Sequence, residues 1–404
     1  MKIVVLKFGG TSVGTISRIK KISKIILSFK KKKYKVIVVT SAMSGMTNKL
    51  IKKSLKISKS FDPIEYDVLV SSGEQISCAL ISGQLKSLGH KSRSFLGWQV
   101  PIITDNNHTN AKIDFVNVRN IKKILSKGII PIVAGFQGIT KNGEVSTLGR
   151  GASDYTAITL AKYFNAEKCV IFTDVDGVMT TDPRNYKKAK KIKTISYEEM
   201  LEMSSLGSKV MQSNSVQEAR LNRTDVLVKS SFKESEGTLI TKRKKIKNHK
   251  IITGISSTKN DAKITLVGVK DKPGVAAAIF KPLSKHNINV DMVVQNISAD
   301  KKETDVTFTI KNENTIKTVN LIKNNKEFKY DKILIDKNVS KLSIIGVGMI
   351  TTPGVTYRMF QALSKNKINI LVISTSEIKI SVLIKQSNLK KGIEALHKEF
   401  NLDN

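Results

Sequence analysis

The first 240 residues alternate between short β-branched runs and stretches with helical periodicity, and this alternation limits the possible folds more than any other feature. The runs lie at 3–7, 35–41, 129–134 and 169–173 and are typical of buried parallel strands. Helix-period stretches such as 17–30 and 153–163 separate them. Because parallel strands are joined by crossover helices, the pattern predicts an α/β domain with a mainly parallel sheet covered on both faces.

The rest of the chain contains an internal repeat. A lysine-rich stretch at 241–250 ends the alternation and predicts a domain boundary. Beyond it, three triplets recur at a constant offset of 80: Pro273-Gly274-Val275 as Pro353-Gly354-Val355, Leu283-Ser284-Lys285 as Leu363-Ser364-Lys365, and Ile288-Asn289-Val290 as Ile368-Asn369-Ile370. A constant offset across separated triplets implies a duplicated unit.

Each copy is predicted to run from a strand through a Pro-Gly turn into a helix and back into a strand. The predicted elements are 264–269, 274–286 and 289–295 in the first copy, and 341–347, 354–366 and 369–374 in the second. Pro and Gly preorganise the N-terminus of each helix, where N–H groups can receive a carboxylate. Duplication alone does not imply binding, so two packing modules without a ligand are the alternative.

Composition excludes several classes of protein. No apolar run of the 404 residues could cross a bilayer and the N-terminus shows no signal peptide, so we expect a cytoplasmic protein without a membrane partner. Cys78 and Cys169 lie far apart in apolar segments, which predicts neither a disulfide nor a zinc cluster. The net charge of +36 suggests nucleic acid, but lysines are spread along the chain and their local runs lack interleaved aromatic residues. We therefore predict no nucleic-acid partner.

A glycine-rich turn follows the first predicted strand. It reads Lys7-Phe8-Gly9-Gly10-Thr11-Ser12-Val13-Gly14, with the lysine before the glycines, so it is neither a Walker A loop nor a dinucleotide fingerprint. Gly9 and Gly10 let backbone N–H groups approach an anion, and Lys7 adds a full positive charge. The turn is predicted to bind phosphate. The alternative is an ordinary glycine turn between a strand and a helix.

A hydroxyl-rich segment follows the second strand, where open α/β sheets bind ligands. Thr40, Ser41, Ser44 and Thr47 supply four hydroxyls between residues 40 and 48. A helix N-cap at Ser44 or Thr47 is the alternative and accounts for only one of them.

Gly149-Arg150-Gly151-Ala152-Ser153-Asp154 opens the helix predicted at 153–163. Arg150 can grip a carboxylate or phosphate through two parallel hydrogen bonds. Ser153 can cap the helix and donate to a ligand, and Asp154 can organise Lys7 or a metal ion. A capped helix with a solvated arginine is the alternative.

The segment from Thr173 to Arg184 follows the last predicted strand. Its D-x-D-G start resembles a calcium loop, but the twelfth residue from Asp174 is Asn185 where an EF-hand needs glutamate, so calcium is rejected. Acids with a terminal arginine suit a nucleotide's ribose, phosphates and magnesium. An ordinary Asp-Pro turn is the alternative for Asp182.

Taken together, these motifs resemble those of the aspartate kinase family. The matching set is K-F-G-G-T-S at 7–12, S-S-G-E at 71–74, G-R-G-x-S-D at 149–154, T-D-V-D-G-V-x-T-x-D-P-R at 173–184 and G-S-K-V at 207–210. The duplicated unit resembles paired ACT domains, through D-K-P-G at 271–274, Q-N at 295–296 and S-T-S-E-I at 374–378. The resemblance covers essentially the whole chain and implies the monofunctional form.

The resemblance implies an α/β fold, a three-layer αβα amino acid kinase fold with a mainly parallel sheet at 1–245, followed by two ACT units of ferredoxin-like βαββαβ type at 262–337 and 341–404. It implies MgATP-dependent phosphorylation of the β-carboxylate of L-aspartate, the first step toward lysine, threonine and methionine. A carboxylate is already a nucleophile at neutral pH, so catalysis rests on alignment and on neutralising charge.

By similarity, each motif acquires a role. Lys7 bridges the phosphates, Gly9 and Gly10 supply backbone donors, and Asp154 orients Lys7 or the magnesium shell. Arg150 and Ser153 hold a substrate carboxylate, Glu74 holds the ammonium, and Ser41 with Thr47 closes the pocket. The nucleotide is contacted by Thr173, Asp174, Met179, Asp182 and Arg184, with Lys209 near its phosphates. No direct metal ligand is predicted. Without the resemblance, Glu74 and Lys209 are read as surface residues.

The sequence departs from the family's pattern at two positions. Ala152 stands where a second glycine is usual, and Met179 stands where an aromatic residue is frequent. Neither change removes a charge or a donor.

The ACT repeat implies feedback inhibition by lysine, threonine or both. Candidate effector residues are Asp271, Gly274, Ala276, Asn289, Asp291 and Gln295 in the first unit, with Thr356 and Asn369 in the second. A homodimer or higher oligomer through the ACT units is expected, and the resemblance allows a short ACT-only subunit from an internal start. A related kinase acting on another carboxylate, such as glutamate, stays open as an alternative.

Overall fold

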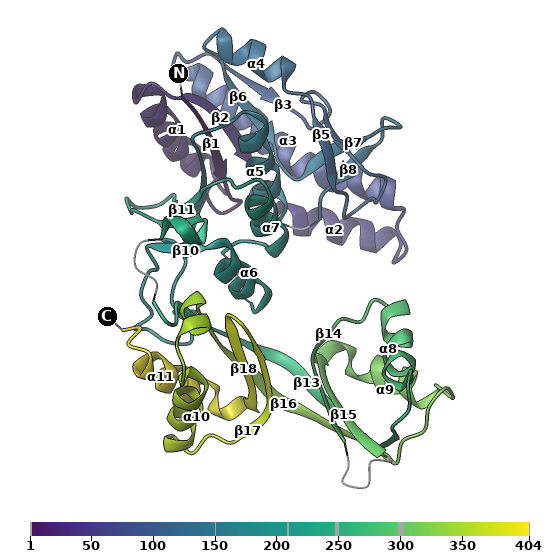
Figure 1. Cartoon of the computed structure of the whole chain (residues 1–404). Coiled ribbons are helices and arrows are strands. Elements are labelled where there is room, and N and C mark those ends of the chain that lie inside the picture. Colours follow the sequence, from purple (N-terminus) through teal and green to yellow (C-terminus); the bar gives the residue numbers. More distant parts are fainter. Residues whose placement is uncertain (1, 150, 208–209, 247–249, 298–302, 404) are drawn as a thin grey trace. The chain divides into compact units, whose positions relative to one another are not determined.

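The protein divides into two compact units (Figure 1). The computed structural model describes residues 2–149, 151–207, 210–246, 250–297 and 303–403. Unit 1 comprises Met1–Val178 and Lys191–Asn248, and unit 2 comprises Met179–Lys190 and His249–Asn404. The segment 179–190 therefore leaves the first unit and belongs to the second.

Unit 1 is built around an eight-stranded sheet in the order β10-β12-β11-β9-β1-β2-β6-β3 (Figure 1). Every neighbouring pair is parallel except β11 and β12. This confirms the mainly parallel sheet. The strands are β1 (Ile3–Phe8), β2 (Lys35–Thr40), β3 (Ser92–Phe95), β6 (Ile130–Ala134), β9 (Lys168–Thr173), β10 (Thr194–Ser196), β11 (Val226–Ser230) and β12 (Thr238–Thr241).

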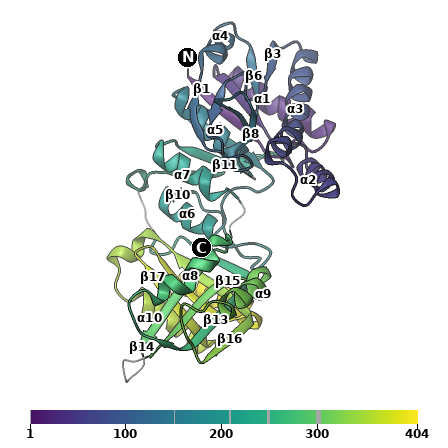
Figure 2. The same ribbon diagram turned by 90° about the vertical axis from the view of Figure 1, so that its right-hand side faces the viewer.

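Helices cover both faces of this sheet, which gives the three-layer αβα arrangement (Figures 1 and 2). Leu6 and Phe8 of β1 share one apolar core with Ile22 of α1 (Ile16–Lys31) and Ile81 of α3 (Pro63–Ser87). Side chains alternate along a strand, so Lys7 points to the opposite face. There α5 (Ser153–Tyr163) contacts β1, β2 and β9. The other helices are α2 (Met46–Ile57), α4 (Arg119–Ser126), α6 (Tyr197–Ser205), α7 (Ser213–Leu221) and the 3₁₀ turn η1 (Arg243–Lys245).

A second, four-stranded sheet in unit 1 was not predicted. Its order is β5-β4-β7-β8, with β4 (Ile102–Thr104), β5 (Ile113–Val116), β7 (Gln137–Thr140) and β8 (Val145–Thr147). It lies in the chain between α3 and α5, and β8 leads directly into the Gly149–Asp154 motif. This sheet therefore fixes where that motif begins.

Unit 2 contains one six-stranded sheet with the order β14-β15-β13-β16-β18-β17. Its strands are β13 (Gly254–Lys270), β14 (Val290–Ile297), β15 (Glu303–Lys311), β16 (Lys332–Ile345), β17 (Ile370–Ser376) and β18 (Lys379–Lys385). Its helices are α8 (Val275–Lys285), α9 (Thr315–Lys323), α10 (Val355–Lys365) and α11 (Leu389–Glu399), with 3₁₀ turns η2 (Asn312–Asn314), η3 (Val347–Thr351) and η4 (Gln386–Asn388). Both predicted helices of the repeat are present, and each begins after a glycine with positive φ, 92° at Gly274 and 83° at Gly354.

The two longest strands serve both halves of this sheet. Residues 261–267 of β13 pair with 332–339 of β16 and complete the first βαββαβ unit. Residues 254–258 pair with 341–345 and supply a fourth strand to the second half, where Ile255 shares a core with Leu342 and Val355. The predicted ranges 262–337 and 341–404 stay a proposal, to which the structure adds this N-terminal strand segment.

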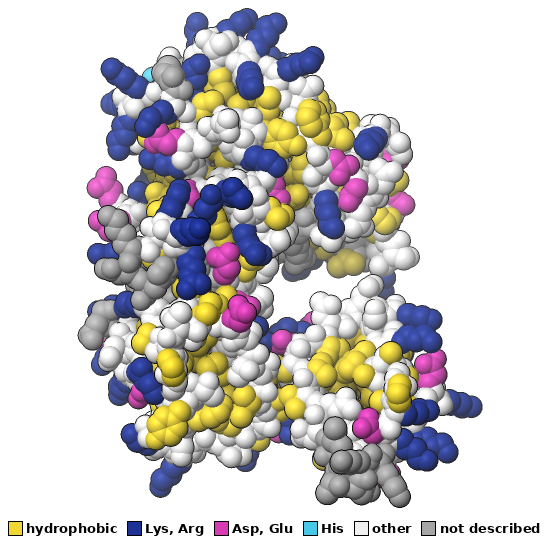
Figure 3. Space-filling view, viewed as in Figure 1, with side chains coloured by type: hydrophobic (Ala, Val, Ile, Leu, Met, Phe, Trp, Pro, Cys, Tyr) yellow, Lys and Arg dark blue, Asp and Glu magenta, His cyan; other side chains and the backbone are white. Residues whose placement is uncertain are grey.

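Positive charge is distributed widely over the surface. Lys and Arg side chains are scattered over the face shown in Figure 3 and do not form a single stripe. Within the described ranges, no helix has the length and apolar character required to cross a bilayer.

Candidate active site

A buried ion pair lies at the centre of the predicted site. Lys7 on β1 and Asp154 in the first turn of α5 are 8% and 6% exposed, and Lys7 Nζ lies 2.5 Å from Asp154 Oδ1. Each charge offsets the cost of burying the other. The pair brings Asp154 into contact with the Lys7 ammonium at the carboxyl end of the sheet, and the role of Asp154 in orienting Lys7 stays a prediction.

The glycine turn after β1 offers donors beside this cation. The N–H of Gly9 donates to Phe172 O at 3.0 Å and is therefore not available to a ligand. The prediction that Gly9 supplies a backbone donor to the phosphates is wrong for this reason. The N–H groups of Gly10 and Thr11 have no backbone acceptor among the described residues. A Cβ at Gly10 would lie 2.9 Å from Ala42 O, which explains the need for glycine there.

Glu74 on α3 is a buried acid with one free oxygen. It is 4% exposed, its Oε1 accepts the Ala42 N–H at 2.9 Å, and its Oε2 has no hydrogen-bond partner within the described part of the chain. Burial raises the pKa of Glu74 to about 7, against the opposing effects of the Ala42 N–H and the Lys7 charge. The reading of Glu74 as a surface acid is therefore wrong. A buried acceptor without a partner suits a cationic ligand group.

These groups face a cleft of about 430 Å³ in unit 1. Its walls include the predicted residues Lys7, Gly9, Gly10, Ser41, Thr47, Glu74, Ser153, Asp154 and Thr173. They also include Asn48, whose amide belongs to the hydroxyl-rich segment at 40–48, and residues that were not singled out, among them Phe136, Met211 and Gln212. Met211 and Gln212 directly follow the G-S-K-V motif at 207–210, and this position in the sequence could have identified them as site residues. The structure thus brings residues from five separate segments of the sequence, 7–12, 40–48, 71–74, 149–154 and 173–184, to one cleft.

Two capping predictions can be checked at this cleft. The N-cap of α2 is Gly45, which makes no side-chain cap hydrogen bond, so neither Ser44 nor Thr47 caps that helix. Both residues line the cleft instead. The prediction that Ser153 caps α5 is wrong, because Ala152 is the N-cap and Ser153 is the first helical residue. Gly135 packs so closely that a Cβ there would lie 2.8 Å from Ser153 Cβ.

The Thr173–Arg184 segment is divided between the two units. Thr173 lines the cleft and its hydroxyl donates to Asp174 Oδ1 at 3.1 Å, with Asp174 exposed. Met179, Asp182 and Arg184 belong to unit 2. There the Arg184 guanidinium donates to both oxygens of Asp182 and lowers the pKa of that carboxyl. Their contact with a nucleotide stays a prediction, and Arg150 and Lys209 lie outside the described residues.

Known proteins match both units. The amino acid kinase family model matches residues 2–230, and the ACT domain model matches residues 264–325 and 342–400. An aspartokinase of Pseudomonas aeruginosa is 45% identical over 406 residues, covering 100% of this chain and 98% of the relative. The chain belongs to the aspartokinase family. Another family member, from Helicobacter pylori strain J99, is 43% identical over 407 residues, covering 99% of this chain and 100% of the relative.

Solved structures of the family agree with this fold. Escherichia coli aspartokinase III in complex with aspartate and ADP is 26% identical, with a TM-score of 0.80 over 98% of this chain and 99% of that one. The same enzyme in complex with lysine and aspartate also gives 0.80 at 26% identity, over 99% and 100% of the two chains. The resemblance and the fold class predicted from the motifs are therefore confirmed.

The candidate effector residues cluster at equivalent places in the two halves of unit 2. Gly274 precedes α8 and Ala276 lies in its first turn, while Thr356 occupies the matching position in α10. Asn289 and Asn369 precede β14 and β17, Asp271 follows β13, and Gln295 lies on β14. All of these are exposed within the single chain.

Asp291, also on β14, is different because its carboxylate is already paired. Its partner is the ammonium of Lys341, which is 4% exposed. The sequence did not predict this ion pair. An effector ammonium would therefore have to share Asp291 with Lys341.

Proposed function

We propose that the chain transfers the γ-phosphoryl group of ATP to the β-carboxylate of L-aspartate, giving ADP and 4-phospho-L-aspartate. The observation that carries this proposal is the cleft itself, which is lined both by the Lys7–Asp154 pair and by Glu74, a buried acid with a free oxygen. A cation suits the phosphoryl group, and the free acid suits an ammonium. The E. coli relative solved with aspartate and ADP supports both assignments.

The reaction requires no general base. An oxygen of the substrate β-carboxylate attacks the γ-phosphorus while the bond to the bridging oxygen of ADP breaks. We assign to Lys7 the neutralisation of the negative charge that moves toward the leaving oxygen, and to the N–H groups of Gly10 and Thr11, which have no backbone acceptor among the described residues, further hydrogen bonds to the phosphates. Asp154 holds the Lys7 ammonium in place.

The aspartate end of the cleft is assigned to α3 and to the hydroxyl-rich segment. Glu74 binds the substrate ammonium through its free Oε2. Ser41 and Thr47 close the pocket around the amino acid, and Ser153 binds a substrate carboxylate together with Arg150. Alignment by several groups reduces the entropic part of the barrier.

The nucleotide end is assigned to Thr173 and Asp174, with Met179, Asp182, Arg184 and Lys209 as further candidates. Mg²⁺ is held in kinases by one or two carboxylates together with the substrate phosphates, and supplies charge neutralisation there. The donor set fits this use, because Asp154 offers a carboxylate in the cleft and Asp174 offers another beside Thr173.

Regulation is assigned to unit 2. The relative solved with lysine and aspartate supports inhibition by lysine, and threonine stays a second candidate. Assembly through the ACT units, a short ACT-only subunit and a cytoplasmic location stay predictions from the sequence.

A coupled assay of ADP release tests the proposal with L-aspartate, with L-glutamate and without an acceptor. We expect MgATP-dependent turnover with aspartate alone. Turnover with glutamate and none with aspartate would assign the cleft to another carboxylate. Titration of lysine and of threonine in the same assay identifies the effector.

A further inference from the structure

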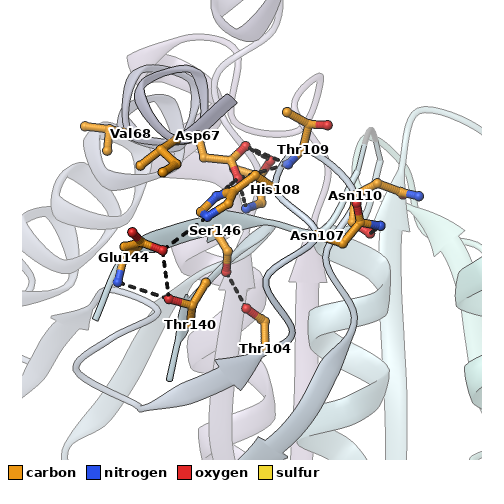
Figure 4. Close-up of polar contacts among 12 residues, drawn as sticks. Asp67, Val68, Thr104, Asn107, His108, Thr109, Asn110, Thr140, Glu144 and Ser146 are labelled. Atoms are coloured by element: carbon orange, nitrogen blue, oxygen red, sulfur yellow. Dashed lines mark hydrogen bonds and ion pairs between the residues drawn. The ribbon is translucent and has the colours of Figure 1, made fainter. Parts of the chain in front are cut away.

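A second buried carboxylate of α3 lies outside the cleft. Asp67 is 0% exposed, and its oxygens accept five hydrogen bonds from His108, Thr109 and Thr147. Figure 4 labels Asp67 with His108 and Thr109. The Thr147 hydroxyl donates to Oδ1 at 2.5 Å and the Thr147 N–H donates to Oδ2 at 3.0 Å. The Thr109 N–H reaches both oxygens at 3.2 and 3.0 Å, and His108 Nδ1 lies 3.0 Å from Oδ2.

Directional hydrogen bonds, rather than a lysine or arginine side chain, stabilise the buried carboxylate of Asp67. Within the described residues, Asp67 makes no ion pair with lysine or arginine. His108, its one ionisable partner, also faces Glu144, whose Oε2 lies 3.5 Å from His108 Nε2 (Figure 4). A buried carboxylate held chiefly by N–H and O–H donors is stable only in one geometry. The donors are therefore fixed in place by Asp67.

Thr147, which donates two of these hydrogen bonds, ends β8 and is separated from the Gly149–Asp154 motif by Leu148 alone. Its own carbonyl accepts the Ala111 N–H at 2.9 Å, and the next residue, Leu148, donates to Phe136 O at 3.0 Å. Gly149 then turns with a φ of 82°, so close to the neighbouring loop that a Cβ would lie 2.7 Å from Asn110 Oδ1. Hydrogen bonds at Thr147 and Leu148 and close packing at Gly149 therefore hold the start of the motif in place.

The same helix carries Glu74 two turns further along. Residues seven positions apart lie on one face of a helix, so Asp67 and Glu74 point the same way from one rigid element. Asp67 is bonded to the strand that leads to Ser153 and Asp154, and Glu74 lines the cleft with those two residues. The distance between the two walls of the aspartate pocket is therefore set through α3.

We propose that Asp67 is a positioning residue for phosphoryl transfer. Through Thr147 it fixes Leu148 and Gly149, where the motif that carries Ser153 and Asp154 begins, relative to Glu74, and so sets the geometry of the aspartate pocket. This rests on the proposed function, in which Glu74 and Ser153 hold aspartate. The glycine turn that offers donors to ATP is hydrogen-bonded to β9, and within the described part of the chain no hydrogen bond joins it to Asp67.

The test uses three variants of the full chain: Asp67→Asn, Thr147→Val and Thr147→Ser. The first two keep the side-chain shape and remove part of the hydrogen bonding, and the third keeps the hydroxyl. We expect kcat/KM for aspartate to fall about tenfold to a hundredfold in Asp67→Asn and Thr147→Val, while KM for ATP stays within about twofold of wild type. Thr147→Ser should retain the wild-type constants within about threefold.

Asp62→Ala serves as the stability control. Asp62 caps the same helix from its exposed N-terminus, so its loss weakens α3 without touching the strand end. We expect a lower melting temperature and unchanged kinetic constants. Unchanged constants for aspartate in Thr147→Val, or equal changes in both KM values, would overturn the proposal. If Asp67→Asn does not fold, the comparison of Thr147→Val with Thr147→Ser tests the proposal. A wild-type chain without aspartate turnover would instead refute the proposed function.

Discussion

The pKa of Glu74 leads to a prediction about the pH dependence of aspartate binding. Burial raises this pKa from 4.5 to about 7 in the empty cleft. An ammonium is bound by the ionised carboxylate, so aspartate must bind to the deprotonated fraction of the enzyme. With a pKa near 7 that fraction is about one tenth at pH 6 and about nine tenths at pH 8. We therefore expect KM for aspartate to fall about tenfold between pH 6 and pH 8.

The same pKa has the opposite effect on the stability of the empty enzyme. Between pH 4.5 and 7 the folded state binds more protons at Glu74 than the unfolded state, so stability falls as pH rises through this range. At about 1.4 kcal/mol per pH unit, the contribution lost is about 3 kcal/mol. Aspartate should restore part of it by pairing with the ionised carboxylate. Thermal unfolding with and without aspartate measures both effects.

The assay is coupled ADP release at saturating MgATP from pH 6 to 8, with Glu74→Gln and the control Glu65→Gln. Glu65 lies in the exposed first turn of the same helix, so its variant should behave as wild type. Glu74→Gln should raise KM for aspartate at pH 8 about tenfold or more and lose the pH dependence. A wild-type KM that does not change with pH, or the same dependence in Glu74→Gln, would refute the assignment of Glu74 to the ammonium.

Two further predictions concern unit 2. Gln295→Ala should weaken inhibition by the effector about fivefold or more with little change in the uninhibited rate. Unchanged effector sensitivity of this variant in the ADP assay would argue against a site on β14. Asp291→Asn should destabilise the protein more than Lys341→Met, because it leaves a buried ammonium unpaired at a cost of about 1–3 kcal/mol, whereas the half-exposed carboxylate stays solvated. Urea unfolding of both variants measures this, and a larger loss in Lys341→Met would contradict it.

Much of the framework could be predicted because local pattern and tertiary packing agree. The runs at 35–41 and 129–134 match β2 and β6 within one residue, and the helix at 153–163 matches α5. Buried parallel strands are apolar on both faces, which makes them visible in a sequence. Motifs at the ends of such strands meet at one edge of the sheet, so the cleft followed from the sequence as well.

Other elements depend on contacts that no local pattern reveals. The strands of the second sheet in unit 1 have three or four residues, too few to show alternation. The first part of β13 is polar from Ser256 to Asp261 and resembles a loop, yet it pairs with β16. Glu74 looked like a surface acid because its burial against Ala42 depends on how α3 packs. The sequence did not reveal the role of Asp67, because its partners His108, Thr109 and Thr147 lie 41, 42 and 80 residues away.

The proposed reaction depends above all on Lys7, and a measurement of kcat tests its role. Lys7 is inferred to neutralise charge that develops during transfer, so Lys7→Ala should lower kcat about a thousandfold, about 4 kcal/mol of transition-state stabilisation. Circular dichroism and a melting curve would confirm that the variant folds. A kcat within about threefold of wild type, with only KM for ATP raised, would show that Lys7 merely binds the nucleotide and would contradict the account.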